Sequence, residues 1–549
     1  MASETRRDLA VLVAAGILFV CACLVLSVPG GPFVSPDETA NAFFAGTFAE
    51  HGRLYAFEPL NEILGDVLHP RSILSLHGRL VPASFPGLPV LYGLAARLLG
   101  IGALPLLTPV VAFLAVLAWY GIVRKLFDPR VARWAALLLF AHPAWWYYAA
   151  RSLMHNVLFT SLLIGSVFFA LVQPFKGLRT RGMRFIPAAA DPALVGICFG
   201  LAVFVRASEA FWMLAGGLLI LVWLHRHVAR QAVAWAVLGA VLAVSPLFFF
   251  NQALYGSPVS TGYTLVAETT DEASQAAVSA PLGGSRSVRS LVAPFGIHPR
   301  IAWSHLLAYG ITLFWWMAVL AVPGFFLAFP KRSDKGARRQ WRWLYLAVFL
   351  FVGGWLALLY GSWTIHDNPD PAAVTIGNSY VRYWLPAFVL TTPFAALAIL
   401  WVRDLLLHPL AQRAWAVGAF LAVFGLGVHG AFFASADSLV LARRTLEAAA
   451  KTRDQVLGLT EPDAVIVVDR ADKLFFPHRR VRYPLRDEAT YALLPRIALR
   501  APLYYFGITL PETDLAYLND DKLKGLGLGI ELVGTYGEES LYRMTSLGQ

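Results

Sequence analysis

Two adjacent carboxylates, Asp37 and Glu38, are placed where chemistry could occur. They follow the first long apolar run of the chain, 9–28, which is about long enough to span a membrane. Both side chains are therefore expected at the membrane surface, just beyond the end of a transmembrane helix. At the edge of a low-dielectric layer the pKa of a carboxylate can be shifted and water can be excluded, and a general base requires both. Two charges that only mark the end of a span would look the same in sequence.

Three arginines lie at the ends of later apolar runs. Arg151 precedes the run 152–174, Arg206 closes the run 193–206, and Arg382 opens the run 382–403. The topology argued below places all three on the outer face, where the positive-inside rule disfavours arginine. A phosphate at the membrane surface would explain them, because guanidinium binds phosphate oxygens bidentately. Lipid head-group contact is the alternative, and for Arg206 an ion pair with Glu209 would also suffice.

Other polar residues lie close to these arginines in the sequence. His155 and Asn156 follow Arg151 by about one helical turn, so they are expected to share its face. A lone histidine there is more often a hydrogen-bonded packing residue than a ligand-binding one. Asp367 and Asp370 precede Arg382 in a proline-containing loop, where we predict turn residues.

The composition is that of an integral membrane protein. Of 549 residues, 58% are hydrophobic and 14% are charged, whereas a soluble domain has about 25% charged residues. The formal net charge of +11 does not indicate nucleic-acid binding, because Lys and Arg form short clusters between apolar runs. The three cysteines, Cys21, Cys23 and Cys198, all lie in apolar runs, without the spacing of a disulfide framework or a metal site.

Eleven apolar runs have roughly spanning length. They are 9–28, 103–124, 131–149, 152–174, 193–206, 209–224, 232–250, 303–329, 343–361, 382–403 and 414–434. Segment 85–102 is also apolar, but it is rich in Gly and Pro. Leaving it out places the basic loops at 124–133, 176–184, 225–230, 331–342 and 403–413 in the cytoplasm, as the positive-inside rule requires. We therefore predict an interfacial helix at 85–102, a cytoplasmic N-terminus and about eleven spans.

Six segments would then lie outside the cytoplasm, namely the loop 29–102, the turns 149–152 and 206–209, the loops 251–302 and 362–381, and the tail from about 435. The two longest bear on the domain organisation. The first is the loop 29–102, which is too long for a plain connector and is therefore expected to carry function. The second is the charged tail 435–549, which has strand-like runs at 464–469 and 503–508 and near 531–534 and 541–544. Helical patterns near 438–458 and 487–500 separate them. We predict a transmembrane domain over 1–434 and a soluble extracytoplasmic α/β domain over 435–549.

The order of several short motifs resembles one known family. The motifs are Asp37-Glu38, Pro86-Gly-Leu-Pro-Val-Leu-Tyr92, Ala150-Arg151, Gly200-Leu-Ala-Val-Phe-Val-Arg206, Asn251 to Tyr263 with Tyr255-Gly-Ser-Pro258 inside it, and Arg382-Tyr-Trp-Leu-Pro386. Over about 9–434, their order and topology are similar to the C-type (GT-C) integral membrane glycosyltransferases. The branch is the one that contains the protein O-mannosyltransferases and the lipid A aminoarabinose transferase.

The resemblance implies a function. In this family a single sugar moves from a polyprenyl-phosphate donor with inversion at the anomeric carbon, to an acceptor that could be a glycan, lipid or protein. It implies that Asp37 is the general base, with Glu38 as its neighbour in the motif. The residues expected to bind substrate, chiefly the lipid phosphate, are Arg151, Arg382, Tyr383, Arg206, His155 and Asn156. The implied location is the plasma (inner) membrane, with membrane lipids as the remaining partners.

One departure from the family and two other functions stay open. Many members carry an acid a few residues after the Ala-Arg pair, where this chain has His155-Asn156; we expect no cofactor, with a divalent metal ion left open. A lipid-linked-sugar flippase is one alternative, but it usually needs acids inside the spans, and no Asp or Glu lies in the interior of the eleven runs. A non-catalytic membrane protein that binds envelope glycans is the other, and it would tolerate Asp37→Asn.

Overall fold

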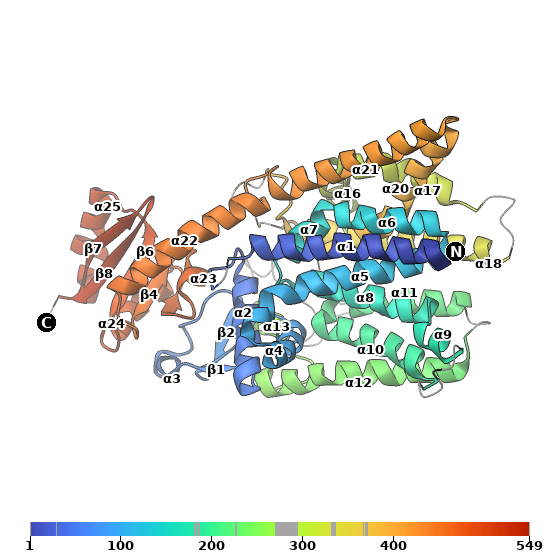
Figure 1. Ribbon diagram of the computed structural model, residues 1–549. Helices are drawn as coiled ribbons and strands as arrows, with labels where there is room; N and C mark the ends of the chain where they lie inside the picture. Colours follow the sequence, from blue (N-terminus) through green and yellow to red (C-terminus); the bar gives the residue numbers. More distant parts are fainter. Residues whose placement is uncertain are drawn as a thin grey trace. The chain divides into compact units, whose positions relative to one another are not determined.

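The computed structural model describes residues 2–28, 30–180, 183, 187–224, 228–269, 295–330, 336–365, 367, 370 and 372–547 (Figure 1). The chain forms two compact units. The membrane unit comprises Met1–Ser27, Phe85–Leu88 and Ala103–Leu441. The loop–tail unit comprises Val28–Ser84, Pro89–Gly102 and Ala442–Gln549. The division at 434/435 predicted above follows chain position, whereas packing groups most of the first loop with the tail.

The membrane unit is a bundle of apolar helices. Among the described residues, seven helical segments are long and apolar enough to cross a membrane. They contain α1 (Ala2–Leu26), α5 (Leu104–Leu126), α8 (His155–Leu171, whose span continues to Gly177), α12 (Arg230–Tyr255), α18 (Ala337–Gly361), α20 (Leu385–Leu405) and α21 (Pro409–Phe432). Shorter helices are α6 (Pro129–Ala141), α7 (Pro143–Ala150), α9 (Pro174–Thr180), α10 (Ala190–Val205), α11 (Ala210–Leu224), α13 (Gly262–Thr269), α16 (Pro299–His305), α17 (Trp315–Ala328) and α19 (Ser379–Tyr383). The prediction of a polytopic helical membrane protein is confirmed.

The residues that the structure describes hold fewer candidate spans than the eleven apolar runs of the sequence. They hold seven candidate spans, or nine when each of two bent helix pairs counts as one. The pair Ala190–Val205 and Ala207–Trp223 bends by 115°, because Arg206 leaves the helical region at φ −144° and ψ 82°. The predicted run 131–149 is divided at His142, which lies at ψ 122°. His142 precedes Pro143, and proline disfavours the helical conformation of the residue before it.

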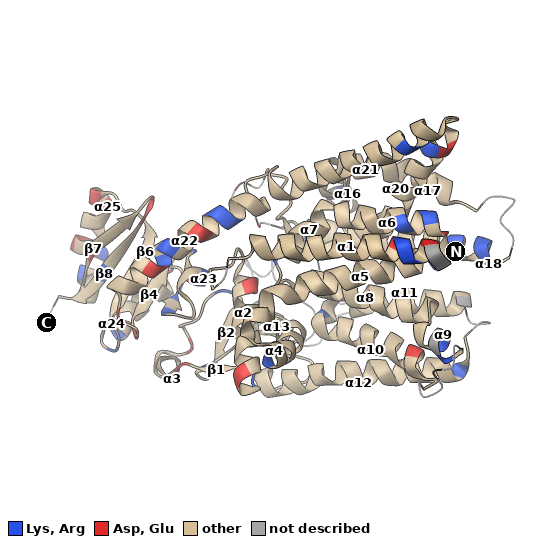
Figure 2. Cartoon of the chain, in the orientation of Figure 1, with Lys and Arg blue, Asp and Glu red and all other residues tan. Residues whose placement is uncertain are grey.

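Basic residues gather at one end of the membrane unit. Figure 2 shows Lys and Arg where α1, α6 and α18 begin. This clustering is what the positive-inside rule requires of a cytoplasmic face. Parts of the predicted basic loops lie outside the described residues, namely 181–182, 184–186, 225–227 and 331–335, as does 270–294 in the loop predicted at 251–302.

The first loop contributes a helix and a small sheet. Helix α2 (Pro36–His51) is followed by an antiparallel sheet of order β1-β3-β2, with β1 Ala56–Phe57, β2 Ile73–Leu76 and β3 Arg79–Pro82, and by α3 (Pro59–Leu64) between β1 and β2. Within segment 85–102 the helix is α4 (Gly87–Leu99), whose 13 residues are too few to span. Its side chains Leu98 and Leu99 are 86% and 67% exposed, as expected of a helix that lies on a membrane surface.

The tail folds as the predicted α/β domain. Its five-stranded sheet has the order β5-β4-β6-β8-β7, with β5, β4 and β6 parallel and the other neighbours antiparallel. The strands are β4 Val465–Val468, β5 Arg480–Arg482, β6 Leu503–Ile508, β7 Leu528–Tyr536 and β8 Glu539–Ser546. The helices are α22 (Leu439–Leu459), α23 (Asp472–Phe475), α24 (Glu488–Ala498) and α25 (Glu512–Tyr517). The predicted strands and both predicted helices are present; β5 was missed because it is short and mostly charged.

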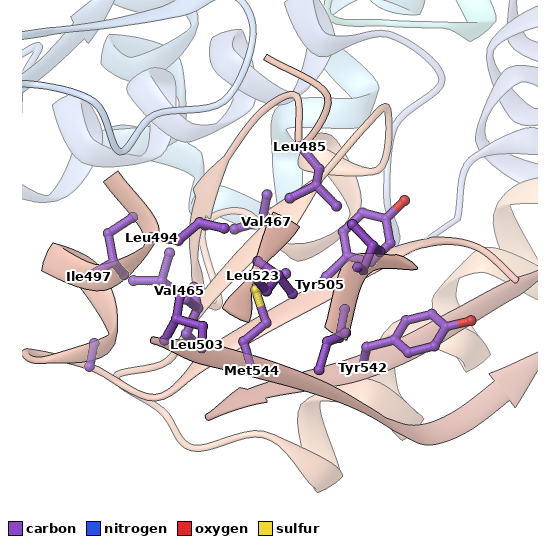
Figure 3. Close-up of a cluster of buried hydrophobic side chains, with 14 of the residues drawn as sticks. Val465, Val467, Leu485, Leu494, Ile497, Leu503, Tyr505, Leu523, Tyr542 and Met544 are labelled. Carbon is purple, nitrogen blue, oxygen red and sulfur yellow. The ribbon is translucent and has the colours of Figure 1, made fainter. Parts of the chain in front are cut away.

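The core of this domain explains why the first loop packs with the tail. Figure 3 shows Val465, Val467, Leu503 and Met544 gathered in one cluster of buried side chains. Leu64 and Leu68 of the first loop belong to the same cluster, and each is only 2% exposed. Burying one such side chain stabilises a fold by about 1.5–3 kcal/mol. The loop is therefore an integral part of the tail's hydrophobic core.

Candidate functional site

The Asp37 helix begins with a capping box. The side chain of Ser35 accepts a hydrogen bond from the Asp37 N–H at 3.2 Å, and Glu38 Oε2 accepts one from the Ser35 N–H at 2.8 Å. The sequence Ser-Pro-Asp-Glu encodes this arrangement, since it combines Ser at the N-cap, Pro at the first position and Glu at the third. Glu38 is 2% exposed. It fixes the start of the helix that carries Asp37.

A hydroxyl from the first loop orients the Asp37 carboxylate. Asp37 is half-buried, and Ser72 Oγ donates a hydrogen bond to its Oδ1 at 2.6 Å. Ser72 has φ +64°, in the left-handed region that L-residues other than Gly, Asn and Asp rarely adopt. It stands directly before β2, so the short sheet anchors it. Sequence reasoning missed Ser72, because 35 positions separate it from Asp37 and no local pattern marks it.

Two of the predicted phosphate-binding arginines lie at one helix junction of the membrane unit. Arg151 caps the C-terminus of α7, and Arg382 lies on α19, which packs against α7 and α8. Arg382 Nη1 is 3.3 Å from Met154 Sδ, and Met154 is the N-cap of α8. The structure therefore places both arginines at the α7–α8 junction, although 231 positions separate them.

Several acceptors fix the segment that leads into Arg382. The Gly377 N–H donates to Asp437 Oδ2 at 2.7 Å, and the Ser379 N–H donates to Asp367 Oδ2 at 2.8 Å. Tyr148 donates its hydroxyl to the carbonyl of Ile376 at 3.1 Å. A Cβ at Gly377 would lie 2.1 Å from Asp437 Oδ2, so the approach requires glycine.

Both predicted turn residues accept backbone hydrogen bonds, Asp367 as above and Asp370 from the Ala372 N–H. Their neighbours 366, 368, 369 and 371 lie outside the described residues.

Arg206 forms the ion pair that was its alternative explanation. Its Nε and Nη2 donate to Glu209 Oε1 at 3.0 and 2.6 Å, and both side chains are buried. Glu209 also accepts from the Trp212 ring at 2.6 Å and from the Tyr360 hydroxyl. These contacts hold the backbone at the bend between α10 and α11. The geometry thus favours a structural part for Arg206 over phosphate binding.

Tyr383 links this ion pair to Arg382. The Arg206 guanidinium lies 4.9 Å from the centre of the Tyr383 ring, and the Arg382 guanidinium lies 5.2 Å from it. The Tyr360 ring stacks on Tyr383 at 4.2 Å with an interplanar angle of 13°. Tyr383 therefore packs against both guanidinium groups, and its predicted part in substrate binding stays a prediction.

We expect Glu209→Leu to destabilise the protein strongly, because it leaves the buried Arg206 charge without its partner. Breaking such a pair typically costs about 3–5 kcal/mol, whereas replacing both charges by apolar groups is often neutral. The double variant Arg206→Leu/Glu209→Leu should therefore unfold, in detergent, near the wild-type temperature. Loss of donor binding in that folded double variant would contradict the structural part given to Arg206.

His155 and Asn156 occupy the first turn of α8 and are 7% and 4% exposed. His155 Nε2 lies 3.2 Å from the carbonyl oxygen of Phe85, which agrees with the packing interpretation. A Cβ at Gly87 would lie 2.3 Å from the carbonyl oxygen of Phe204, and the Phe85 ring lies 5.3 Å from that of Tyr263. Segment 85–88 thus packs against α8, α10 and the segment around Tyr263.

The residues that the structure describes contain no group of three or more His, Cys, Asp and Glu side chains arranged to hold a metal ion.

The comparisons with known proteins identify the fold. No family model and no curated protein sequence matches the chain. Among solved structures, ArnT from Cupriavidus metallidurans in the apo state matches at a TM-score of 0.56 and 15% identity, over 96% of this chain and 97% of that chain. The same protein bound to undecaprenyl phosphate matches at 0.55 and 14%, with the same coverage. The oligosaccharyltransferase AglB from Archaeoglobus fulgidus, in complex with an inhibitory peptide and a dolichol-phosphate, matches at 0.51 and 14%, over 94% of this chain and 70% of that chain. The chain is a multi-pass membrane protein with the GT-C fold that the order of its motifs predicts.

Proposed function

We propose that the protein is an inverting glycosyltransferase that moves a single sugar from a polyprenyl-phosphate donor to an acceptor hydroxyl on the outer face of the membrane. The observation that carries the proposal is that Arg151 and Arg382 both lie at the α7–α8 junction, Arg151 as the C-cap of α7 and Arg382 against Met154 at the start of α8. Guanidinium groups suit the oxygens of a phosphate. The shared fold adds support, because ArnT and AglB bind undecaprenyl phosphate and a dolichol-phosphate in their structures.

The reaction needs one base and positive charge on the leaving group. The acceptor oxygen attacks C1 of the sugar while the Asp37 carboxylate takes the hydroxyl proton. The bond between C1 and the phosphate oxygen breaks, and its electron pair leaves with the polyprenyl phosphate. This leaving group is a weak base, so no general acid is required. Arg382 and Arg151 would stabilise the charge that develops on its oxygens.

The proposal includes a location and further partners. The N-terminus would be cytoplasmic and the tail extracytoplasmic in the plasma (inner) membrane, which the basic residues at one end of the membrane unit support. The reaction requires an acceptor with a hydroxyl group, which a glycan, a lipid or a protein can supply. No cofactor is proposed, and a divalent ion stays a variable for the assay.

The buried acids of the membrane unit favour the transferase over a flippase. A transport path needs acids that can exchange partners inside the bundle. Asp8 pairs with Arg133 at 2.9 Å, Asp191 accepts the Lys176 N–H at 2.7 Å, and Glu209 holds Arg206. Each of these acids thus has a structural contact, which favours chemistry at the surface over passage through the bundle.

Binding of polyprenyl phosphate tests the donor class directly. A ligand at 100 times its Kd stabilises the folded state by about 2.7 kcal/mol, so the lipid should raise the unfolding temperature of the purified protein. The polyprenyl alcohol, which lacks the phosphate, should raise it much less, and Arg382→Ala should remove the difference. Equal shifts with both lipids would contradict a phosphate site at Arg151 and Arg382.

A further inference from the structure

A buried ion pair joins the first loop to the tail beside Asp37. The carboxylate of Asp472 is fully buried and accepts three hydrogen bonds from Arg71. They come from the Arg71 backbone N–H at 2.8 Å, from Nε at 3.0 Å and from Nη2 at 2.5 Å. The same Nη2 donates to the Arg470 carbonyl at 2.7 Å. Residue 71 is therefore fixed through both its backbone and its side chain.

The place of this pair in the tail is informative. Asp472 begins α23, which follows β4, and β4 has the parallel strands β5 and β6 on its two sides. Open α/β sheets bind their ligands at the carboxyl ends of parallel strands, where the strand order diverges. In this chain Arg71 occupies that edge. In this tail, the edge at which open α/β sheets bind ligands is therefore occupied by the first loop.

Helix α23 also holds the start of α2. Lys473 donates from Nζ to the carbonyl oxygen of Val34, which directly precedes the N-cap Ser35. The Phe476 ring, at the end of α23, packs edge-on against Phe43 of α2 at 4.8 Å. One short segment of the tail therefore contacts both the helix that carries Asp37 and the residue before Ser72.

We propose that Asp472 is a positioning residue for the Asp37 carboxylate, acting through Arg71 and Ser72. Holding Arg71 fixes the left-handed backbone of Ser72, and Ser72 in turn holds Asp37 Oδ1. A misplacement of about 1 Å at a reacting group can lower a rate by about 10²-fold. The tail is then a part of the catalytic apparatus and not a separate accessory domain. This inference rests on the proposed function for its effect on rate, but its structural content can be measured without activity.

The first test compares rates. Ser72→Ala should lower kcat by about 10- to 100-fold and leave the KM for donor unchanged, because the variant mispositions the base without touching the donor site. Asp472→Asn keeps the shape of the side chain but loses the ion pair, so it should lower kcat by about 10-fold in the same manner. Since both act through one contact, the double variant should be no slower than Ser72→Ala alone.

A matched control is available in the same unit. Glu58 forms a second ion pair between loop and tail, with Arg480 at 2.9 Å, and has no hydrogen bond with Arg71 or Ser72. Glu58→Gln should lower the unfolding temperature while kcat per folded molecule stays at the wild-type value. Two results would contradict positioning through Arg71 and Ser72. One is an unchanged kcat per folded molecule in Asp472→Asn, as expected for Glu58→Gln. The other is a loss of kcat in the double variant equal to the product of the two single losses.

The second test does not depend on catalysis. Amide hydrogen exchange of the full-length protein should become faster at 35–44 and 72–76 in Asp472→Asn, and should stay unchanged there in Glu58→Gln. If exchange is faster in Asp472→Asn but the wild-type protein transfers no sugar, the positioning contact is supported and the proposed function is rejected. Unchanged exchange in Asp472→Asn would overturn the inference, whatever the activity.

Discussion

Replacing Asp37 by Asn is expected to lower sugar transfer by about 10²- to 10⁴-fold, the usual contribution of a positioned general base. The amide has the size of the carboxylate, and its oxygen can still accept the hydrogen bond from Ser72. It cannot take up the acceptor's proton. Donor binding should therefore stay near the wild-type value, and the loss should appear in kcat. The measurement is the initial rate of transfer of labelled sugar at saturating donor.

The neighbouring acid is the matched control for this variant. Glu38→Gln also removes one negative charge from the first turn of α2. Glutamine can still accept the Ser35 N–H hydrogen bond that completes the capping box. We expect Glu38→Gln to retain most activity and stability. If it loses as much activity as Asp37→Asn, the base is not assigned correctly within the Asp-Glu pair.

Replacing Arg382 by Ala should lower transfer by about 10²- to 10³-fold, as loss of one charge-stabilising donor does in other enzymes. Polyprenyl-phosphate binding should weaken as well. Arg382→Lys should recover only part of the rate, because an ammonium group cannot form the bidentate contact. Initial rates and donor titrations of the purified variants measure both effects.

Arg403 serves as the control for loss of a positive charge. It lies near the C-terminus of α20 and pairs with Asp404 at 2.5 Å. Arg403→Ala removes the same charge from the membrane unit at a site outside the α7–α8 junction. Its transfer rate should stay within about twofold of wild type, since surface pairs contribute little to stability. An equal loss of activity in Arg403→Ala and Arg382→Ala would contradict a specific phosphate site.

Much of the fold follows from periodicity and charge. Apolar runs separated by basic loops predict the helices, and alternating runs at 464–469 and 503–508 predict the strands β4 and β6. The described residues hold fewer candidate spans than the eleven apolar runs, because hydropathy alone does not show where a helix bends or breaks. His142 leaves the helical conformation inside the run 131–149, and Arg206 bends the chain between the runs 193–206 and 209–224.

The candidate site was only partly accessible to the same reasoning. Asp37 and Glu38 stand out because their capping sequence is local and follows the first run. Ser72, Arg71 and Asp472 could not be found, because their contacts join positions up to 401 residues apart. The ion pair of Arg206 was foreseen as an alternative, since Glu209 lies three positions on. Contacts within one turn can be predicted from sequence, whereas contacts between loop and tail require the fold.

The most direct test of the account is transfer by the purified full-length protein in lipid vesicles, using a panel of labelled polyprenyl-phosphate sugars and an envelope extract as acceptor. The account predicts that wild type converts one donor to polyprenyl phosphate and labels the acceptor, and that Asp37→Asn does neither while still binding that donor. Equal transfer by Asp37→Asn would contradict Asp37 as the base. Movement of the intact labelled donor across the vesicle membrane, without release of polyprenyl phosphate, would replace the transferase by the flippase.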